Sequence, residues 1–271
     1  MKRVTSTLAI LLVSLLPASA RAANGAKEAS WVPRYDWSLE VDGKPSDEAH
    51  FFVEVEGRRI LVQSPELTKA AILNPTGQKV TELDRSSIVI GDDGDTAKVS
   101  PSAETKSPSG TYTVDGGRVL FYLGDNRLKI SPKQPLEGEA TAEEILHHSP
   151  LYRKGMTEYT PEAAEVSFIH SFRQPILIEV FFGTWCPHCK VLVPKFMKTM
   201  EEADNPLIRI DYTGVPRNFG TYPPAMARKV TGIPTFIFYR NGVEFGRIPG
   251  EPTKGTIEQA VSEILRGAPS K

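Results

Sequence analysis

Residues 181–190 read FFGTWCPHCK and place two cysteines, Cys186 and Cys189, two positions apart after an apolar run. The 271-residue chain has no other cysteine. The pair therefore cannot belong to a larger disulfide framework, and it supplies at most half of a zinc site. Two thiols at this spacing at the start of a helix can form and break a disulfide with each other, so they are a candidate redox centre.

The pattern after the apolar run predicts a helix that begins at the cysteine pair and extends to about Glu202. Unpaired N–H groups and the helix dipole at such an N-terminus favour a thiolate, which makes Cys186 the candidate nucleophile and Cys189 the resolving thiol. Pro187 suits an early helix position because it lacks an N–H that would have no intrahelical partner. His188 can add a charge or a hydrogen bond to the thiolate, which would make the disulfide more oxidising.

The N-terminus has the pattern of a secretory signal peptide, expected over residues 1–22. Lys2 and Arg3 precede an apolar stretch at 8–16 that is too short to span a bilayer, and residues 18–20 read ASA, a typical cleavage site. This pattern predicts an exported protein, in the periplasm or alternatively outside the cell. No later stretch is apolar enough for stable membrane insertion, and the net charge of -1 gives no reason to expect nucleic-acid binding.

The rest of the chain divides into three segments. Short apolar runs separated by Gly, Pro and Asp turns predict a small β-rich sandwich or barrel domain over residues 31–130. Residues 131–155 are expected to form a linker with one short helix, which opens at a capping box of Thr141 and Glu144. Residues 156–268 alternate between helix and strand patterns.

Several local signals define that last segment. An almost continuous apolar run at 176–182 predicts a strand buried on both faces. A helix is expected to start at Pro161 after a Thr160 cap. Asn-Gly at 241–242 predicts a tight hairpin, and Thr256 opens a final amphipathic helix that ends at Gly267.

Four features together resemble the thioredoxin superfamily over residues 156–267. They are FFGTWCPHCK at 181–190, Pro194 in the following helix, TGIPTF at 231–236 and Gly250 after the hairpin. The resemblance implies an α/β thioredoxin fold in the C-terminal part, preceded by the β-rich domain, which lies outside it. It also implies that Pro234 is cis and faces the cysteines.

The resemblance further implies how a substrate is held and how protons move. The backbone of Ile233 would pair with the substrate chain, and Trp185 would cover the edge of the site. The family often has a buried acid six residues before the first cysteine, where this chain has Val180. Neighbouring Glu179 should face the other way on a strand, as an ion-pair partner or an edge residue. Proton transfer would then rely on water or His188.

The direction of electron flow stays open. Cys-Pro-His-Cys resembles periplasmic disulfide oxidases, whereas Trp185 and Ile233-Pro234 are similar to thioredoxin itself. We predict an exported thiol–disulfide oxidoreductase that acts on protein thiols or disulfides and on a redox partner protein, without metal or cofactor. It could dimerise through its N-terminal domain. The alternative is a non-enzymatic partner-binding protein or a Cu(I) chaperone built on a thioredoxin-like platform.

Overall fold

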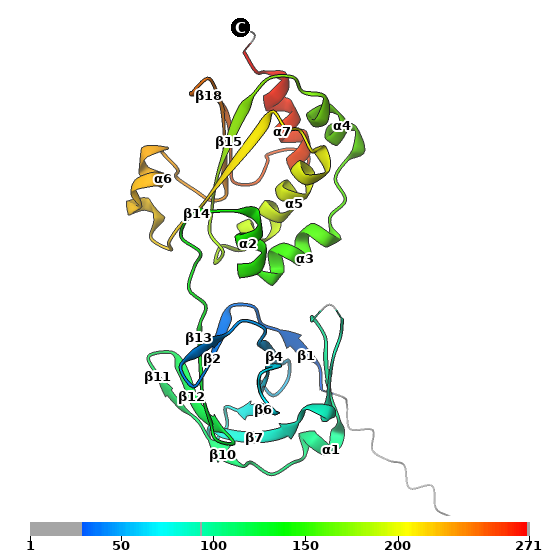
Figure 1. Cartoon of the computed structure of the whole chain (residues 1–271), viewed down its shortest axis with the longest axis vertical. Helices are drawn as coiled ribbons and strands as arrows, with labels where there is room; N and C mark the ends of the chain where they lie inside the picture. The colour runs from blue at the N-terminus through cyan, green and yellow to red at the C-terminus, as the bar shows by residue number, and fades with distance from the viewer. Residues whose placement is uncertain (1–28, 93, 270–271) are drawn as a thin grey trace, which may run out of the picture.

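The computed structural model describes residues 29–92 and 94–269, and it has a β-rich N-terminal part and an α/β C-terminal part (Figure 1). The predicted signal peptide at 1–22 and its cleavage site lie outside the described residues. Within those residues, no helix has the length and apolar character needed to cross a bilayer.

The N-terminal part is built from a larger and a smaller antiparallel sheet. The larger sheet has the spatial order β10 (Gly110–Thr111), β7 (Lys79–Asp84), β6 (Lys69–Asn74), β5 (Ile60–Gln63), β4 (His50–Glu54), β1 (Trp31–Pro33), β9 (Ala97–Val99) and β8 (Ile88–Ile90). The smaller sheet has the order β11 (Thr113–Asp115), β12 (Arg118–Leu123), β13 (Asn126–Pro132), β2 (Trp37–Val41) and β3 (Lys44–Ser46). A short helix, α1 (Pro101–Glu104), and a 3₁₀ turn, η1 (Arg85–Ser87), join the outer strands.

Both N-terminal sheets contribute side chains to one apolar core. Phe51 and Leu73 come from the larger sheet, and Leu39, Phe121 and Leu128 come from the smaller one. Side chains alternate between the two faces of a strand, so each sheet can direct one apolar row inward. The prediction of a β-rich domain in front of the α/β part is confirmed, because two packed sheets occupy this region.

The C-terminal part contains a mixed sheet with the order β14 (Gly138–Ala140), β16 (Ile208–Gly214), β15 (Ile176–Phe182), β17 (Thr235–Arg240) and β18 (Val243–Pro249). Strands β15 and β16 are parallel, and the other neighbours are antiparallel. One face of central β15 is fully buried, but on the other face Leu177 and Glu179 are partly exposed and Phe181 is buried, so the burial on both faces that the apolar run predicted is incomplete.

Helices cover both faces of this sheet (Figure 1). One face packs against α2 (Ala142–His148), α3 (Pro150–Glu158), α4 (Ala163–Ser171), α5 (Pro187–Ala203) and α7 (Ile257–Arg266), which share one core with the strands. The other face packs against η2 (Phe219–Thr221) and α6 (Pro223–Ala227). The α/β architecture implied by the resemblance is present.

Two expectations about residues 131–163 differ from the structure. The segment 131–155, expected to be a linker with one short helix, instead supplies strand β14 and helices α2 and most of α3 to the C-terminal core. The helix expected from Pro161 begins at Ala163, with Glu162 as its N-cap. The buried carboxylate of Glu258 accepts the N–H of Glu162 at 3.0 Å, which holds the backbone at this point.

The local helix and turn signals agree with the structure. Thr141 with Glu144 and Thr256 with Gln259 both form complete capping boxes. Asn241 and Gly242 have positive φ angles of 48° and 78° in the β17–β18 hairpin, as an Asn-Gly turn requires. These features depend on neighbouring residues only, so the sequence pattern identifies them directly.

Candidate active site

The cysteine pair lies where β15 ends and α5 begins. Cys186 is the N-cap of α5, with Pro187 as the first helical residue. The N–H of Cys186 donates to the carbonyl of Gly183 at 2.9 Å, which closes the turn between strand and helix. The unpaired N–H groups of the first helical turn therefore face the Cys186 sulfur, as the sequence predicted.

The two thiols occupy different environments. Both are free and buried, Cys186 with 5% of its surface exposed and Cys189 with none. A hydrogen bond from the Cys189 thiol lowers the pKa of Cys186 to about 6, against the opposing effect of burial. The backbone N–H groups of Cys189 and His188, and then the His188 charge, act in the same direction. Burial first, and the bond to Cys186 second, raise the pKa of Cys189.

This asymmetry predicts the pH dependence of alkylation of the reduced protein. We expect the rate to rise with pH and to reach half of its plateau near pH 6, because only the Cys186 thiolate reacts. The folded pKa lies below that of an unfolded thiol, about 8.5. The lowered pKa therefore stabilises the reduced folded state. This stabilisation is complete above about pH 8.5, the unfolded pKa, and is lost as the pH falls through about 6, the folded pKa. Iodoacetamide kinetics or ultraviolet thiolate absorbance measures the midpoint.

The Cys189→Ala variant is the control for that titration. It lacks the thiol that donates to Cys186, so its midpoint should move to higher pH. A midpoint that stays near that of the unmodified pair would contradict the role of this hydrogen bond.

Tyr152 closes the inner side of the pair and was not identified from the sequence. Its side chain comes from α3, is fully buried, and donates from its hydroxyl to the carbonyl of Gly183 at 3.4 Å. The N–H of Gly183 in turn donates to the Cys189 sulfur at 3.4 Å. Burial, and secondarily the charge on the cysteines, raises the pKa of Tyr152, so the phenol stays protonated. Val180, at the position of the family's acid, is buried in the same apolar core.

The loop before β17 lies against Cys186. The Ile233–Pro234 peptide bond is cis, and the Cys186 thiol donates to the carbonyl of Ile233 at 3.7 Å. The N–H of Gly250 donates to the carbonyl of Pro234 at 2.7 Å, in a backbone conformation with φ of 80° that favours glycine. The tertiary structure thus brings residues 233–234 and 250 to the pair.

Trp185 forms one wall of the site. Its indole N–H donates to the carbonyl of Val215 at 3.0 Å, and the Arg217 guanidinium lies 5.3 Å from the ring centroid. Gly183 allows this packing, because a Cβ there would lie 2.8 Å from the indole ring. Trp185 therefore has a fixed orientation beside Cys186, on the side that faces the N-terminal part.

His188 lies on the outside of the site. Its side chain is 66% exposed, and its Nδ1 atom lies 3.2 Å from the Glu251 carboxylate. The sequence suggested direct support of the thiolate by this imidazole. In the structure, the Cys189 thiol and two backbone N–H groups act more strongly on the Cys186 pKa than the His188 charge does.

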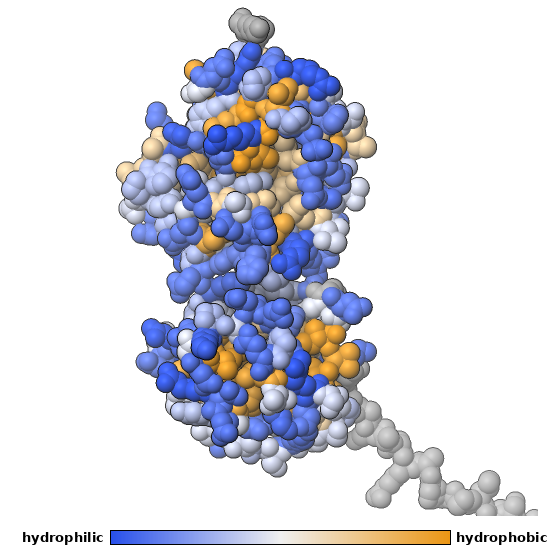
Figure 2. Space-filling model, in the orientation of Figure 1, coloured by the Kyte–Doolittle hydropathy of each residue, from blue (hydrophilic) through white to orange (hydrophobic). Residues whose placement is uncertain are grey.

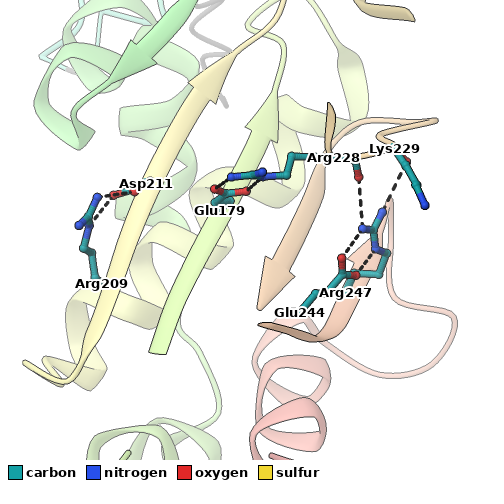
Figure 3. Close-up of polar contacts among 7 residues, drawn as sticks. All are labelled: Glu179, Arg209, Asp211, Arg228, Lys229, Glu244 and Arg247. Carbon is teal, nitrogen blue, oxygen red and sulfur yellow. Dashed lines mark hydrogen bonds and ion pairs between the residues drawn. The ribbon is translucent and has the colours of Figure 1, made fainter. Parts of the chain in front are cut away.

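Figure 3 shows the Glu179 side chain of β15 pointing toward Arg228. Its neighbour Val180 is buried in one core with Cys186 and Cys189, so Glu179 lies on the opposite face of the strand. Its carboxylate accepts two bonds from the Arg228 guanidinium, at 2.5 and 2.6 Å. The same guanidinium lies over the Tyr239 ring. Glu179 is therefore an ion-pair partner, one of the two roles expected for it, and it takes no part in the thiol site. In the described part of the chain, no group of three or more His, Cys, Asp or Glu side chains is arranged to hold a metal ion.

Comparisons with known proteins match the same region. The Thioredoxin family model matches residues 159–263. The chain is 30% identical over 122 residues to chloroplastic thioredoxin X of Arabidopsis thaliana, covering 44% of this chain and 62% of that protein. It is 29% identical over 113 residues to the bifunctional thioredoxin reductase/thioredoxin of Mycobacterium leprae, covering 41% of this chain and 23% of that one.

A third relative is matched over most of its length. The chain is 31% identical over 88 residues to thioredoxin-2 of Saccharomyces cerevisiae, covering 32% of this chain and 78% of the yeast protein. With the cysteine pair at the β15–α5 junction and the mixed sheet behind it, these matches show that the chain belongs to the thioredoxin family.

Proposed function

We propose that this protein is an exported thiol–disulfide oxidoreductase that exchanges disulfides with protein partners through Cys186 and Cys189. The observation that carries the proposal is the division between the two thiols. Cys186 lies at a helix N-terminus with a pKa lowered to about 6, and Cys189 is held beneath it as a protonated thiol. Export rests on the signal-peptide pattern of residues 1–22, and the periplasm is the compartment that we propose.

The proposed exchange has two steps. In the first, the Cys186 thiolate attacks one sulfur of a partner disulfide, forms a mixed disulfide and releases the other partner sulfur as a thiolate. In the second, Cys189 gives up its proton and attacks the Cys186 sulfur. That step forms the 186–189 disulfide and releases the partner's second thiolate, so two electrons pass to the partner. A redox partner protein restores the starting state, and the same steps run in reverse when the protein oxidises its substrate.

The lowered pKa of Cys186 supports an oxidising tendency of the disulfide. Stabilising the thiolate stabilises the reduced form and makes the disulfide more oxidising. The hydrogen bonds that lower this pKa to about 6 act in that direction. We therefore propose that the potential is more positive than the thioredoxin value of about -270 mV.

Two measurements test the function and its direction. Purified protein lacking residues 1–22 should catalyse reduction of insulin disulfides by dithiothreitol, well above the uncatalysed rate. Equilibration with glutathione buffers should give the potential of the 186–189 pair. Absence of turnover with insulin and in refolding of a reduced substrate would favour a non-enzymatic binding role. A potential at or below about -270 mV would exclude the oxidising direction.

A further inference from the structure

A groove separates the β-rich part from the Trp185 side of the active site. It has a volume of about 270 Å³. Its walls come from the start of β2, the segment after β13, the α2–α3 junction and the loops that follow β15 and β16. The chain passes from β13 to β14 along one side of the gap between the two parts (Figure 1). In the same view, hydrophilic residues cover the surface where the two parts meet (Figure 2).

Bonds between the two parts hold the groove in position. The Leu136 N–H donates to the Thr184 hydroxyl at 3.2 Å, which ties the connecting chain to the residue before Trp185. Lys133 Nζ donates to the carbonyl of His148 at 2.5 Å. On the other side of the gap, Lys154 of α3 forms an ion pair with Asp95 of the β-rich part. The groove is thus built from segments that lie outside the family match at 159–263 as well as from segments inside it.

The charged groups that line the groove are mostly cationic. Lys133, Lys190 and Arg217 carry positive charge, while the carboxylate of Asp36 is already paired with Arg34 at 3.0 Å. His148 adds no charge at neutral pH, because burial and nearby Lys133 lower its pKa to about 4. A cationic groove attracts acidic groups over distances of about 8 to 10 Å at moderate salt.

Aromatic side chains form the apolar walls. Trp37 and Tyr35 lie on the β-rich side, and Trp185 lies on the side of the cysteines. Protein interfaces are enriched in Trp, Tyr and Arg, because these side chains combine apolar area with polar atoms. Trp185 and Arg217 therefore connect the groove directly to the position where a substrate sulfur must meet Cys186.

We propose that this groove binds an extended segment of the substrate polypeptide that carries acidic side chains next to its target cysteine. This proposal rests on the proposed function and names its substrate class. Lys190 and Arg217 would pair with carboxylates close to the cysteine, while Trp37 and Tyr35 would contact the segment further along. The β-rich part then selects substrates by forming the second wall of the groove.

The test measures binding without chemistry. Three peptides share one sequence with serine at the cysteine position and have Glu, Gln or Lys at the three flanking sites. Calorimetry at low salt should give a Kd about tenfold lower for the Glu peptide than for the Lys peptide, since two or three exposed ion pairs contribute. In concentrated salt the difference should shrink to about twofold. Equal Kd values for the three peptides would overturn the proposal.

Variants locate the binding site. Arg217→Glu combined with Lys190→Glu should remove or invert the preference for the Glu peptide. Arg217→Lys keeps the positive charge and should preserve the preference for the Glu peptide. The matched control is Lys98→Glu, at an exposed position on β9 outside the groove, which should bind like the unmodified protein. A preference that survives in the double variant would place the acidic site elsewhere and contradict the proposal.

The result is independent of the exchange reaction, because the peptides carry no thiol. Turnover of the small neutral substrate hydroxyethyl disulfide by the unmodified protein and by the Lys98→Glu control, whose substitution lies outside the groove, measures the exchange reaction separately. Charge-selective binding without turnover would leave the groove proposal intact and refute the oxidoreductase. Turnover without charge-selective binding would refute the groove proposal and leave the proposed oxidoreductase function intact.

Discussion

Replacing Cys186 by serine should lower the rate of insulin reduction by at least about a thousandfold, to the uncatalysed level. A serine hydroxyl at this position is not ionised near neutral pH, whereas the Cys186 thiol has a pKa of about 6. The hydrogen bonds that lower this pKa act on the sulfur and cannot create an alkoxide. The readout is the rate of insulin precipitation at fixed dithiothreitol concentration.

Replacing Cys189 should affect a different step. Cys189→Ala keeps the attacking thiol but lacks the resolving one, so a mixed disulfide with the substrate should accumulate on Cys186. Mass spectrometry of the unreduced protein should then find a one-to-one adduct that dithiothreitol releases. Full activity of the Cys186→Ser variant, or an adduct that maps to Cys189 in the unmodified pair, would contradict the assigned roles.

Replacing Phe196 by alanine should destabilise the α/β part by about 3 to 5 kcal/mol. Phe196 is fully buried on α5, and its ring centroid lies 4.7 Å from that of Phe236 on β17. It joins the helix that begins at the cysteines to the strand that follows Pro234. Loss of the ring removes buried apolar area and leaves a cavity, and both effects favour unfolding. Guanidinium denaturation of the reduced protein, followed by far-ultraviolet circular dichroism, measures the change.

The matched control lies on the same helix. Val191 is 54% exposed, so Val191→Ala should change the free energy of unfolding by no more than about 0.5 kcal/mol. Since the chain has two parts, the transition of the α/β part must be fitted separately. A loss below about 1 kcal/mol for Phe196→Ala would show that the helix is not anchored by this contact.

The elements around the cysteine pair are ones that local sequence patterns could predict. The apolar run before Cys186, the Pro at 187 and the pattern that follows as far as Glu202 predicted a strand, a turn and a helix, because each of these depends on neighbours along the chain. The same holds for the capping box at Thr141 and the Asn-Gly hairpin. The resemblance also identified Pro234 as a residue of the site, although it lies 45 positions beyond Cys189 in sequence.

Other features of the site have no local signal. Tyr152 reaches the cysteines only because α3 packs closely on α5, where a Cβ at Gly155 would lie 2.9 Å from Pro194. The pairing of Glu179 with Arg228 joins residues 49 positions apart. The assignment of 131–155 as a linker failed to anticipate β14 and α3 for the same reason. A short strand at a sheet edge and a helix of modest amphipathicity are stabilised by partners elsewhere in the chain.

The sequence by itself predicted thiol–disulfide chemistry with Cys186 as the attacking and Cys189 as the resolving sulfur, and it determined the order of the elements that carry them. Those properties follow from residue types and from interactions over a few positions. Only the tertiary structure decided what surrounds the sulfurs: the buried Tyr152 on one side, the cis Ile233–Pro234 bond on another, and the cationic groove toward the β-rich part. Burial and pKa depend on packing between distant segments, and that packing exists only after the chain has folded.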